Sequence, residues 1–201
     1  RTGAQRRLRH RRFRWRRRLE AAYAFRCSKR QKRMPNHKFY LSFGRHERYG
    51  SGDAAIERED MIAAYLTGQE LKSCLPCCAA VYHSPLERAA ETARFEALGL
   101  GTSHLLEVSQ LEETATKYEI NRFLNQLLIN TDDNTNYYHF VTHLPVIEKL
   151  GFPFLGAGEV CLLTAANKED MLAENFTLQI MAKPVVVAEI WQKLNLTVNT
   201  L

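Results

Sequence analysis

Three short segments of the chain carry histidine or arginine close to the end of an apolar run. Arg45 and His46 follow the first run, Arg88 lies shortly after the second, and His143 follows a later one. Arginine binds phosphate oxygens through two parallel hydrogen bonds, and a neutral imidazole is a competent nucleophile near pH 7. Gathered at one place, these four side chains would form a compact cationic pocket suited to a phosphate group.

Each histidine alone is weak support for catalysis, because a lone histidine at a strand end is more often a hydrogen-bonded or exposed structural residue. The argument therefore depends on the elements that bring the segments together. Apolar runs of strand length occupy residues 37–43, 78–82, 105–108, 137–142, 160–164 and 176–181. Helical spacing of apolar residues occupies 54–72, 84–99, 112–129, 146–150 and 186–194.

Strands that alternate with amphipathic helices predict an α/β fold, a three-layer α/β/α sandwich around a mostly parallel central sheet. The last two strands have no predicted helix between them, which adds an antiparallel late strand. Ligands in such folds bind beyond the carboxyl ends of the strands. Residues 44–48, 82–93 and 140–145 are expected at that edge, so the predicted topology brings the two arginines and two histidines together.

Two local signals mark helix starts. Asp53 is the expected N-cap of helix 54–72. Ser84-Pro85-Leu86-Glu87 has the Ser-x-x-Glu pattern of a capping box, with proline at the first helical position. Both signals predict a helix directly after a segment that carries polar residues.

The charge divides the chain into two parts. Residues 1–33 contain 13 Arg and 2 Lys against the single acid Glu20, a net charge of +14. The remaining 13 basic and 21 acidic residues give 34–201 a net charge of −8. Because a block of like charge repels itself, we expect 1–33 to be disordered or non-native and 34–201 to be the folded domain.

Three interpretations of the basic segment stay open. In the first, the segment is a tail that binds nucleic acid or an anionic membrane, and it is the part of the chain for which a nucleic-acid partner is conceivable. In the second, it is an Arg-rich transit peptide, which would direct the protein to a mitochondrion or plastid. In the third, it lies upstream of the natural start, since the first methionine is Met34. Without a transit peptide we expect a cytoplasmic protein, and no run of 18 apolar residues predicts a membrane span.

The cysteines and paired histidines do not predict a metal site. Cys74 and Cys77 form a CxxC motif, but a zinc site needs a second ligand pair. His139 and His143 have metal-ligand spacing for a helix, yet they lie on a strand-like run without a third ligand nearby. An odd number of cysteines without a secretory signal favours reduced thiols. We therefore expect no metal and no cofactor.

At the residues named first, the chain resembles a known family. Arg45-His46 is similar to the Arg-His signature of the histidine phosphatases, the phosphoglycerate mutase-like superfamily. Ser84-Pro85-Leu86-x-Arg88-Ala89-x-x-Thr92-Ala93 resembles that family's second block, and Val141-Thr142-His143-Leu144-Pro145-Val146 resembles its third. The similarity extends to about Pro184. The short domain and the His-Leu-Pro of the third block are most similar to the small bacterial phosphohistidine phosphatases of the SixA type.

The resemblance implies a mechanism without a metal. His46 would attack phosphorus and become a phosphohistidine that water then hydrolyses, while Arg45, Arg88 and His143 would hold the phosphoryl oxygens. The substrate would be a phosphorylated small molecule or a phosphohistidine protein. Mutases of the family carry extra chain that closes over phosphoglycerate, and little is available here. A phosphatase is therefore favoured over a mutase.

The resemblance leaves the general acid open. Many members use a carboxylate about 20 to 30 residues after the second arginine to protonate the leaving group. Glu107, Glu112 and Glu113 fall in this range, and Glu112 aligns best. The same acids would also favour the N-terminus of the following helix. A phosphohistidine phosphatase can lack the acid, because an imidazole leaving group has its own protonation site.

Two residues depart from the family pattern. Gly44 replaces an apolar strand residue, which would allow a bulge beside Phe43. Glu47 directly follows the nucleophile, where glycine or alanine is usual, and its carboxylate would repel phosphate unless it turned away, for example toward Arg48. A second function therefore stays open: a weakly active or inactive member of the fold that binds a phosphorylated ligand.

Overall fold

The computed structural model describes residues 24–25, 37–47, 56–132 and 134–184. The strands are β1 (Ala24–Phe25), β2 (Phe39–Arg45), β3 (Ala80–His83), β4 (Leu105–Glu107), β5 (Tyr137–Thr142), β6 (Val160–Ala165) and β7 (Phe176–Met181). The helices are α1 (Arg58–Cys74), α2 (Glu87–Leu100), the 3-10 helix η1 (Ser109–Leu111), α3 (Lys117–Asn130), α4 (Leu144–Leu150) and α5 (Lys168–Leu172). Within these ranges, no helix combines the length and apolar character that a membrane crossing requires.

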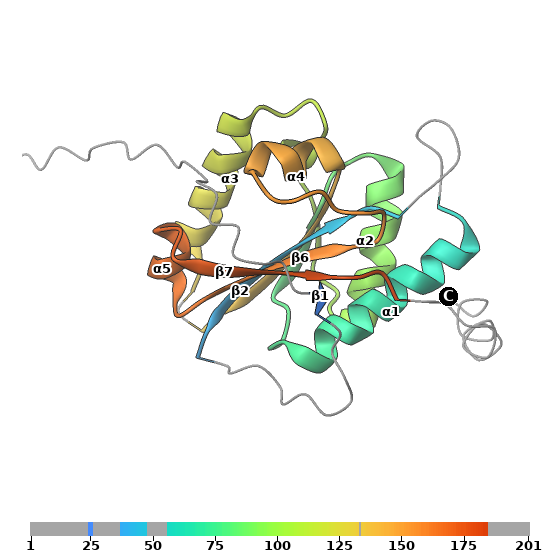
Figure 1. The fold of residues 1–201 in the computed structure, drawn as a ribbon, viewed down its shortest axis with the longest axis horizontal. Coiled ribbons are helices and arrows are strands. Elements are labelled where there is room, and N and C mark those ends of the chain that lie inside the picture. Colours follow the sequence, from blue (N-terminus) through green and yellow to red (C-terminus); the bar gives the residue numbers. More distant parts are fainter. Residues whose placement is uncertain (1–23, 26–36, 48–55, 133, 185–201) are drawn as a thin grey trace, which may run out of the picture.

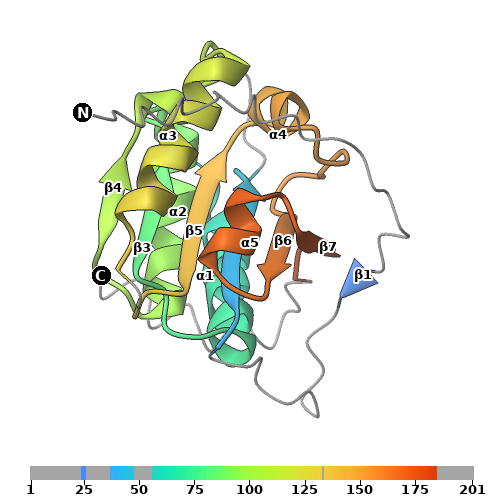
Figure 2. The ribbon, with the colours of Figure 1, turned by 90° about the vertical axis from the view of Figure 1, so that its left-hand side faces the viewer.

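A seven-stranded sheet in the order β1-β7-β6-β2-β5-β3-β4 forms the middle layer, and Figure 2 shows it from β4 on one side to β1 on the other. β5 is parallel to both β2 and β3, and β3 is parallel to β4. β6 is antiparallel to its neighbours β2 and β7. The carboxyl ends of β2, β3 and β5 therefore meet at one edge, where Arg45 pairs with Thr142 and His83 pairs with Val141.

Helices cover both faces of the sheet (Figures 1 and 2). One face carries a core that α1 and α2 close, and Tyr40 of β2 belongs to it. The other face carries a core that α3, α4 and α5 close, and Leu41 of the same strand belongs to that one. Because successive residues point to opposite faces, a strand buried on both sides is an almost continuous apolar run. The predicted three-layer sandwich with an antiparallel late strand is confirmed.

α1 and α2 pack closely because each has a glycine at the contact. A Cβ added at Gly68 would lie 2.1 Å from the carbonyl oxygen of Glu96, and one at Gly99 would lie 2.2 Å from that of Tyr65. Both distances are far inside van der Waals contact, so only glycine lets the two backbones approach this closely. The contact sets the position of α2, which carries Arg88 at the edge of the sheet.

Both predicted helix starts differ from the structure. α1 begins at Arg58 with Glu57 as its N-cap, while Asp53 lies outside the described residues. α2 begins at Glu87, and its N-cap residue Leu86 makes no side-chain cap. Ser84 closes no capping box with Glu87; its hydroxyl accepts from the N–H of Leu86 at 3.4 Å and also contacts a histidine at the sheet edge.

Other differences lie late in the chain and in β2. The connection after β6 contains α5, which was not predicted; Asn167 caps it by accepting from Asp170 N at 2.8 Å. β2 has no bulge at Gly44, because its register with β5 is unbroken.

Cys77, Cys78 and Cys161 are free thiols as predicted, whereas Cys74 is disulfide-bonded against the prediction. Helix 186–194, and residues 1–33 apart from β1, lie outside the described residues.

Candidate active site

His46 lies directly after β2, at the edge where the parallel strands end. Its backbone N–H donates to Thr142 O at 3.0 Å, so the pairing with β5 continues to the histidine itself. Its ring Nδ1 lies 2.6 Å from the carbonyl oxygen of Glu47. A carbonyl oxygen only accepts, so Nδ1 carries the proton. This tautomer leaves Nε2 with the lone pair that a nucleophile needs.

His143 follows β5, and its ring lies close to that of His46, with 4.9 Å between the ring centroids. The ring is fully buried, and its Nε2 lies 2.8 Å from Ser84 Oγ. Ser84 comes from the turn between β3 and α2, so this hydrogen bond joins the second and third sequence motifs. The Ser84 hydroxyl, which resembled a helix cap in the sequence, thus lies at the start of α2 and also orients a histidine.

Arg45 and Arg88 add two guanidinium groups to the cluster. Arg88, in the first turn of α2, is buried, and its Nη2 lies 2.5 Å from Glu113 Oε1. Arg45 is the last residue of β2; its Nη1 donates to Leu155 O at 2.8 Å. The Arg45 guanidinium also lies 5.7 Å from the centre of the Phe154 ring, which is 67% exposed.

The carboxylate at this cluster belongs to Glu113, and the structure does not bring Glu112 to it. Glu113 Oε1 touches Arg88 and lies 3.3 Å from His143 Nδ1. Glu112 is the C-cap residue directly after η1, and its carboxylate accepts from Thr114 Oγ1 at 3.3 Å. The sequence indicated the right segment, but in an irregular turn neighbouring side chains point in different directions, and no periodicity tells which of them reaches the cluster.

Two hydrogen bonds hold the segment that carries Glu113. Thr142 Oγ1, from the end of β5, donates to Leu111 O at 2.6 Å. Lys149 Nζ, from α4, donates to the carbonyl oxygen of Glu113 at 2.6 Å. Neither residue was a candidate in the sequence, because threonine and lysine bonds to backbone carbonyls have no motif.

The environment keeps both imidazoles neutral near pH 7. Burial lowers the pKa of His46 to about 4; the hydrogen bond to the Glu47 carbonyl opposes this shift, and the charges of Arg88 and Arg45 add to it. Burial lowers the pKa of His143 to about 3, and His46, Arg88 and Arg45 add to that shift. The positive charge of the cluster therefore resides on the guanidinium groups, while the rings keep their lone pairs.

Donor atoms of His46, Glu113 and His143 lie within 4.8 Å of one another, a spacing that could hold a metal ion. Two guanidinium groups beside them repel a cation and attract an oxyanion, so we interpret the cluster as an anion site. His139, the other half of the metal-like pair in the sequence, does not face this cluster. Its Nε2 lies 2.6 Å from Glu96 Oε2 inside the core.

Comparison of the sequence with protein-family models and with curated protein sequences finds no match. Comparison with solved structures finds close similarity to the protein histidine phosphatase SixA complexed with tungstate. Its TM-score is 0.59 at 16% identity, over 72% of this chain and 97% of that one. The chain has the histidine phosphatase fold. The resemblance predicted from the three motifs is confirmed at this level.

Other solved structures share this fold. A mycobacterial glucosyl-3-phosphoglycerate phosphatase matches with a TM-score of 0.52 at 12% identity, over 74% of this chain and all of its own. A protein described as mycobacterial hydrolase 1 matches with a TM-score of 0.56 at 12% identity, over 73% of this chain and all of its own. The histidine phosphatase fold of this chain is therefore shared by proteins that differ in substrate.

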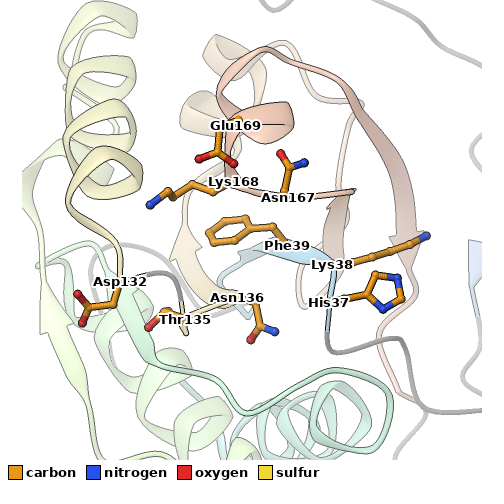
Figure 3. Close-up of a pocket in the computed structure, with 9 residues that line it drawn as sticks. All are labelled: His37, Lys38, Phe39, Asp132, Thr135, Asn136, Asn167, Lys168 and Glu169. Carbon is orange, nitrogen blue, oxygen red and sulfur yellow. The ribbon is translucent and has the colours of Figure 1, made fainter.

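A shallow pocket of about 180 Å³ lies at the opposite edge of this histidine phosphatase fold. Figure 3 shows its side chains around the ring of Phe39, at the start of β2, with Asn136 before β5 and Lys168 and Glu169 on α5. Among the described residues its lining has no arginine, and the pocket lies before the parallel strands rather than after them. We therefore keep the candidate site at the carboxyl edge.

Proposed function

We propose that residues 34–201 form a phosphatase in which His46 Nε2 accepts a phosphoryl group. In the first step a bond forms between Nε2 and phosphorus while the bond from phosphorus to the leaving nitrogen or oxygen breaks, and the leaving group takes up a proton. In the second step water attacks the phosphohistidine, so inorganic phosphate leaves and the lone pair returns to Nε2. The guanidinium groups of Arg45 and Arg88 stabilise the phosphoryl oxygens without a metal.

One observation carries this proposal: a neutral His46 with its proton on Nδ1 lies among two arginines and a second neutral histidine. A nucleophile needs a free lone pair, and a transferring phosphoryl group needs preorganised positive charge. Burial and the hydrogen bond to the Glu47 carbonyl keep the lone pair on His46 Nε2. Arg45 and Arg88 supply the positive charge. A structural histidine in the core would need neither.

Unpartnered buried atoms give independent support for an oxyanion. Arg45 Nε is buried and makes no hydrogen bond within the described residues, and His143 Nδ1, 3.3 Å from Glu113 Oε1, makes none of good geometry there either. A buried polar atom without a partner costs about 1–3 kcal/mol, so native proteins rarely keep one without a functional reason. Phosphoryl oxygens beside His46 would accept hydrogen bonds from Arg45 Nε.

We assign protonation of the leaving group to Glu113 instead of Glu112. The Glu113 side chain is 42% exposed and contacts Arg88 and His143, so it borders the cluster from the solvent side. Binding of phosphate would compete with Glu113 for Arg88, and the freed carboxyl group could then approach the leaving atom. An imidazole leaving group would need this acid less than an alkoxide would.

Two substrate classes fit this chemistry, phosphohistidine and phosphomonoesters. The structural neighbours include a protein histidine phosphatase and a sugar-phosphate phosphatase, and the His-Leu-Pro segment at residues 143–145 resembles the SixA type. We therefore propose phosphohistidine as the first substrate to test and a phosphatase rather than a mutase as the activity.

The test combines turnover with trapping of the intermediate. The full chain is mixed with a phosphohistidine peptide or a sugar phosphate, and inorganic phosphate is measured together with protein-bound phosphate that is stable to alkali and labile to acid. We expect turnover that EDTA leaves unchanged and that vanadate inhibits. His46→Ala should abolish both signals, whereas His104→Ala, at an exposed histidine, should abolish neither. Equal activity of His46→Ala and the wild type would exclude His46 as the nucleophile.

One observation favours the second candidate function, a phospho-ligand binding module. Arg88 is already paired with Glu113, so a bound phosphate must first displace a carboxylate. If that pair stays closed during binding, phosphate occupies the site without correct alignment to His46. Tungstate binding without turnover or trapped phosphohistidine would support this function over the first.

A further inference from the structure

Glu47, the residue that departs from the family pattern, is held in place at both its backbone and its side chain. Its N–H donates to Thr92 Oγ1 at 3.1 Å, and the Thr92 hydroxyl donates in turn to Arg88 O at 2.7 Å. The Glu47 side chain has no exposed surface. It therefore does not project into the phosphate site as a free carboxylate, and Arg48, the partner expected from the sequence, lies outside the described residues.

The partner of Glu47 is Lys183, 136 residues away in the segment that follows β7. Lys183 Nζ donates to Glu47 Oε2 at 2.5 Å and to Asp60 Oδ1 of α1 at 2.7 Å. One ammonium group thus joins the nucleophile segment, α1 and the end of β7. The Lys183 side chain is 31% exposed, so it closes the cluster toward solvent while Glu47 remains inside.

The position of Glu47 matters to His46 because the two residues share a hydrogen bond. The carbonyl oxygen of Glu47 accepts from His46 Nδ1–H, the bond that determines which ring nitrogen is the nucleophile. The carboxylate and the carbonyl belong to one residue, so the acceptor of His46 moves if the Glu47 backbone shifts when its side chain leaves the core.

We propose that Lys183 is a positioning residue for His46: by pairing with the buried Glu47 carboxylate, it keeps the Glu47 carbonyl on Nδ1 and Nε2 directed at phosphorus. The structural half of this inference stands on the contacts alone. Its catalytic half rests on the proposed phosphatase function.

Charge determines what loss of Lys183 would do. Within the described residues, the charged groups that act on the Glu47 carboxylate are Lys183, Asp60 of α1 and Glu96 of α2. The pKa of Glu47 is raised to about 7: burial contributes most, Lys183 opposes the rise, and the negative charges of Asp60 and Glu96 add to it. Without the Lys183 ammonium group the pKa of Glu47 would rise above this value. The charge that lowers it would be gone, while burial and the charges of Asp60 and Glu96 would stay.

Loss of Lys183 should act differently at low and at high pH. At low pH the protonated Glu47 of a Lys183→Met variant is neutral and can stay buried. At high pH the same carboxyl group ionises without a partner, and a buried unpaired charge is driven toward solvent or toward the arginines of the phosphate site. Loss of Lys183 should therefore impair the nucleophile selectively on the alkaline side.

The experiment compares Lys183→Met, the double variant Glu47→Gln/Lys183→Met and the control Lys168→Met. Lys168 donates to the Thr131 carbonyl at the opposite edge of the sheet, so its loss also removes one lysine hydrogen bond. Ring nitrogen shifts of His46, measured by NMR on 15N-histidine protein from pH 5 to 9, give its tautomer independently of catalysis. Phosphate release over the same range gives kcat.

We expect Lys183→Met to match the wild type at pH 6 and to lose kcat about tenfold at pH 9, with a mixed tautomer at His46. The double variant should restore both signals at pH 9, because position 47 then carries no charge, and Lys168→Met should change neither. The double variant also covers the case in which Lys183→Met unfolds. An unchanged His46 tautomer at pH 9, or no rescue by Glu47→Gln, would overturn the inference. A shifted tautomer in a protein without turnover would overturn the proposed function instead and leave the positioning role supported.

Discussion

Glu113 and Glu47 are two acidic residues in the neighbourhood of His46, and the carboxylate of each is paired with a cation in a different environment. Glu113 is 42% exposed and pairs with Arg88 at the open side of the cluster. Glu47 is fully buried and pairs with Lys183, whose own side chain is 31% exposed. One pair can open to exchange a partner, whereas the other holds the chain in place.

The energies of the two pairs differ for the same reason. An ion pair with a solvent-exposed partner contributes about 0–1 kcal/mol, because water screens it and replaces it easily. Removing one partner of a buried pair costs about 3–5 kcal/mol, and the partial exposure of Lys183 puts its pair at or below the lower end of that range. Opening the Glu113–Arg88 pair to a phosphate should therefore cost less than separating Glu47 from Lys183.

The largest expected effect is that of Arg88→Ala. This change removes the guanidinium group that phosphate and Glu113 share, so kcat/KM should fall by about 10²- to 10³-fold. Glu113→Gln should instead tighten tungstate binding several-fold, because the competitor for Arg88 is gone. Steady-state kinetics and calorimetric titration with tungstate measure both effects. Arg94→Ala, at an exposed position of the same helix, is the control, and a loss there equal to that of Arg88→Ala would contradict the assignment.

Gly158→Ala should come next, because it strains the buried pair. Gly158 has φ +74°, and an added Cβ would lie 2.5 Å from Glu47 Oε1. Gly151→Ala shares the left-handed backbone, with φ 83°, at the end of α4. The backbone alone should cost each variant about 1–2 kcal/mol in denaturant unfolding. Only Gly158→Ala should also lose kcat, and equal activities of the two variants would argue against a role for Glu47.

The pH profile should show a displaced acid limb. The pKa values of His46 and His143, about 4 and about 3, lie below the ordinary value of 6.5. The unfolded chain therefore binds more protons as the pH falls below 6.5, so the stability that the neutral rings provide is complete above pH 6.5 and is lost toward pH 4. kcat/KM should hold down to pH 5 and be half lost near pH 4. A midpoint near 6.5 would show that the rings are not buried as described.

The smallest effect is expected at Phe154. Its exposed ring beside Arg45 offers a stacking surface for the part of the substrate outside the phosphoryl group, and it touches no reacting atom. Phe154→Ala should raise KM for a phosphohistidine peptide about threefold and leave kcat unchanged. Tyr118→Ala, at an exposed aromatic residue of α3, provides the matched control. A change in kcat instead of KM would place Phe154 nearer the chemistry than the structure indicates.

Much of this fold was predictable because its signals are local. The apolar runs that became β5 and β7 were predicted with the limits that the structure has, since both are rich in aromatic and β-branched residues, which favour strands. Arg45, Arg88 and His143 could be grouped with His46 because parallel strands deliver their ends to one edge. Helix starts were less predictable: Ser84 has the pattern of a cap, but its hydroxyl contacts His143.

By itself, the sequence determined the three-layer architecture and the four cationic or imidazole residues at one edge, because periodicity and motif order are local and additive. Only the tertiary structure decided which acid reaches that edge and what becomes of the atypical Glu47. Glu113 rather than Glu112 arrives there through the path of an irregular turn held by Thr142 and Lys149. Glu47 finds Lys183 across 136 residues. Such a pair forms because burial makes an unpaired charge costly, and only the packed chain determines where that burial occurs.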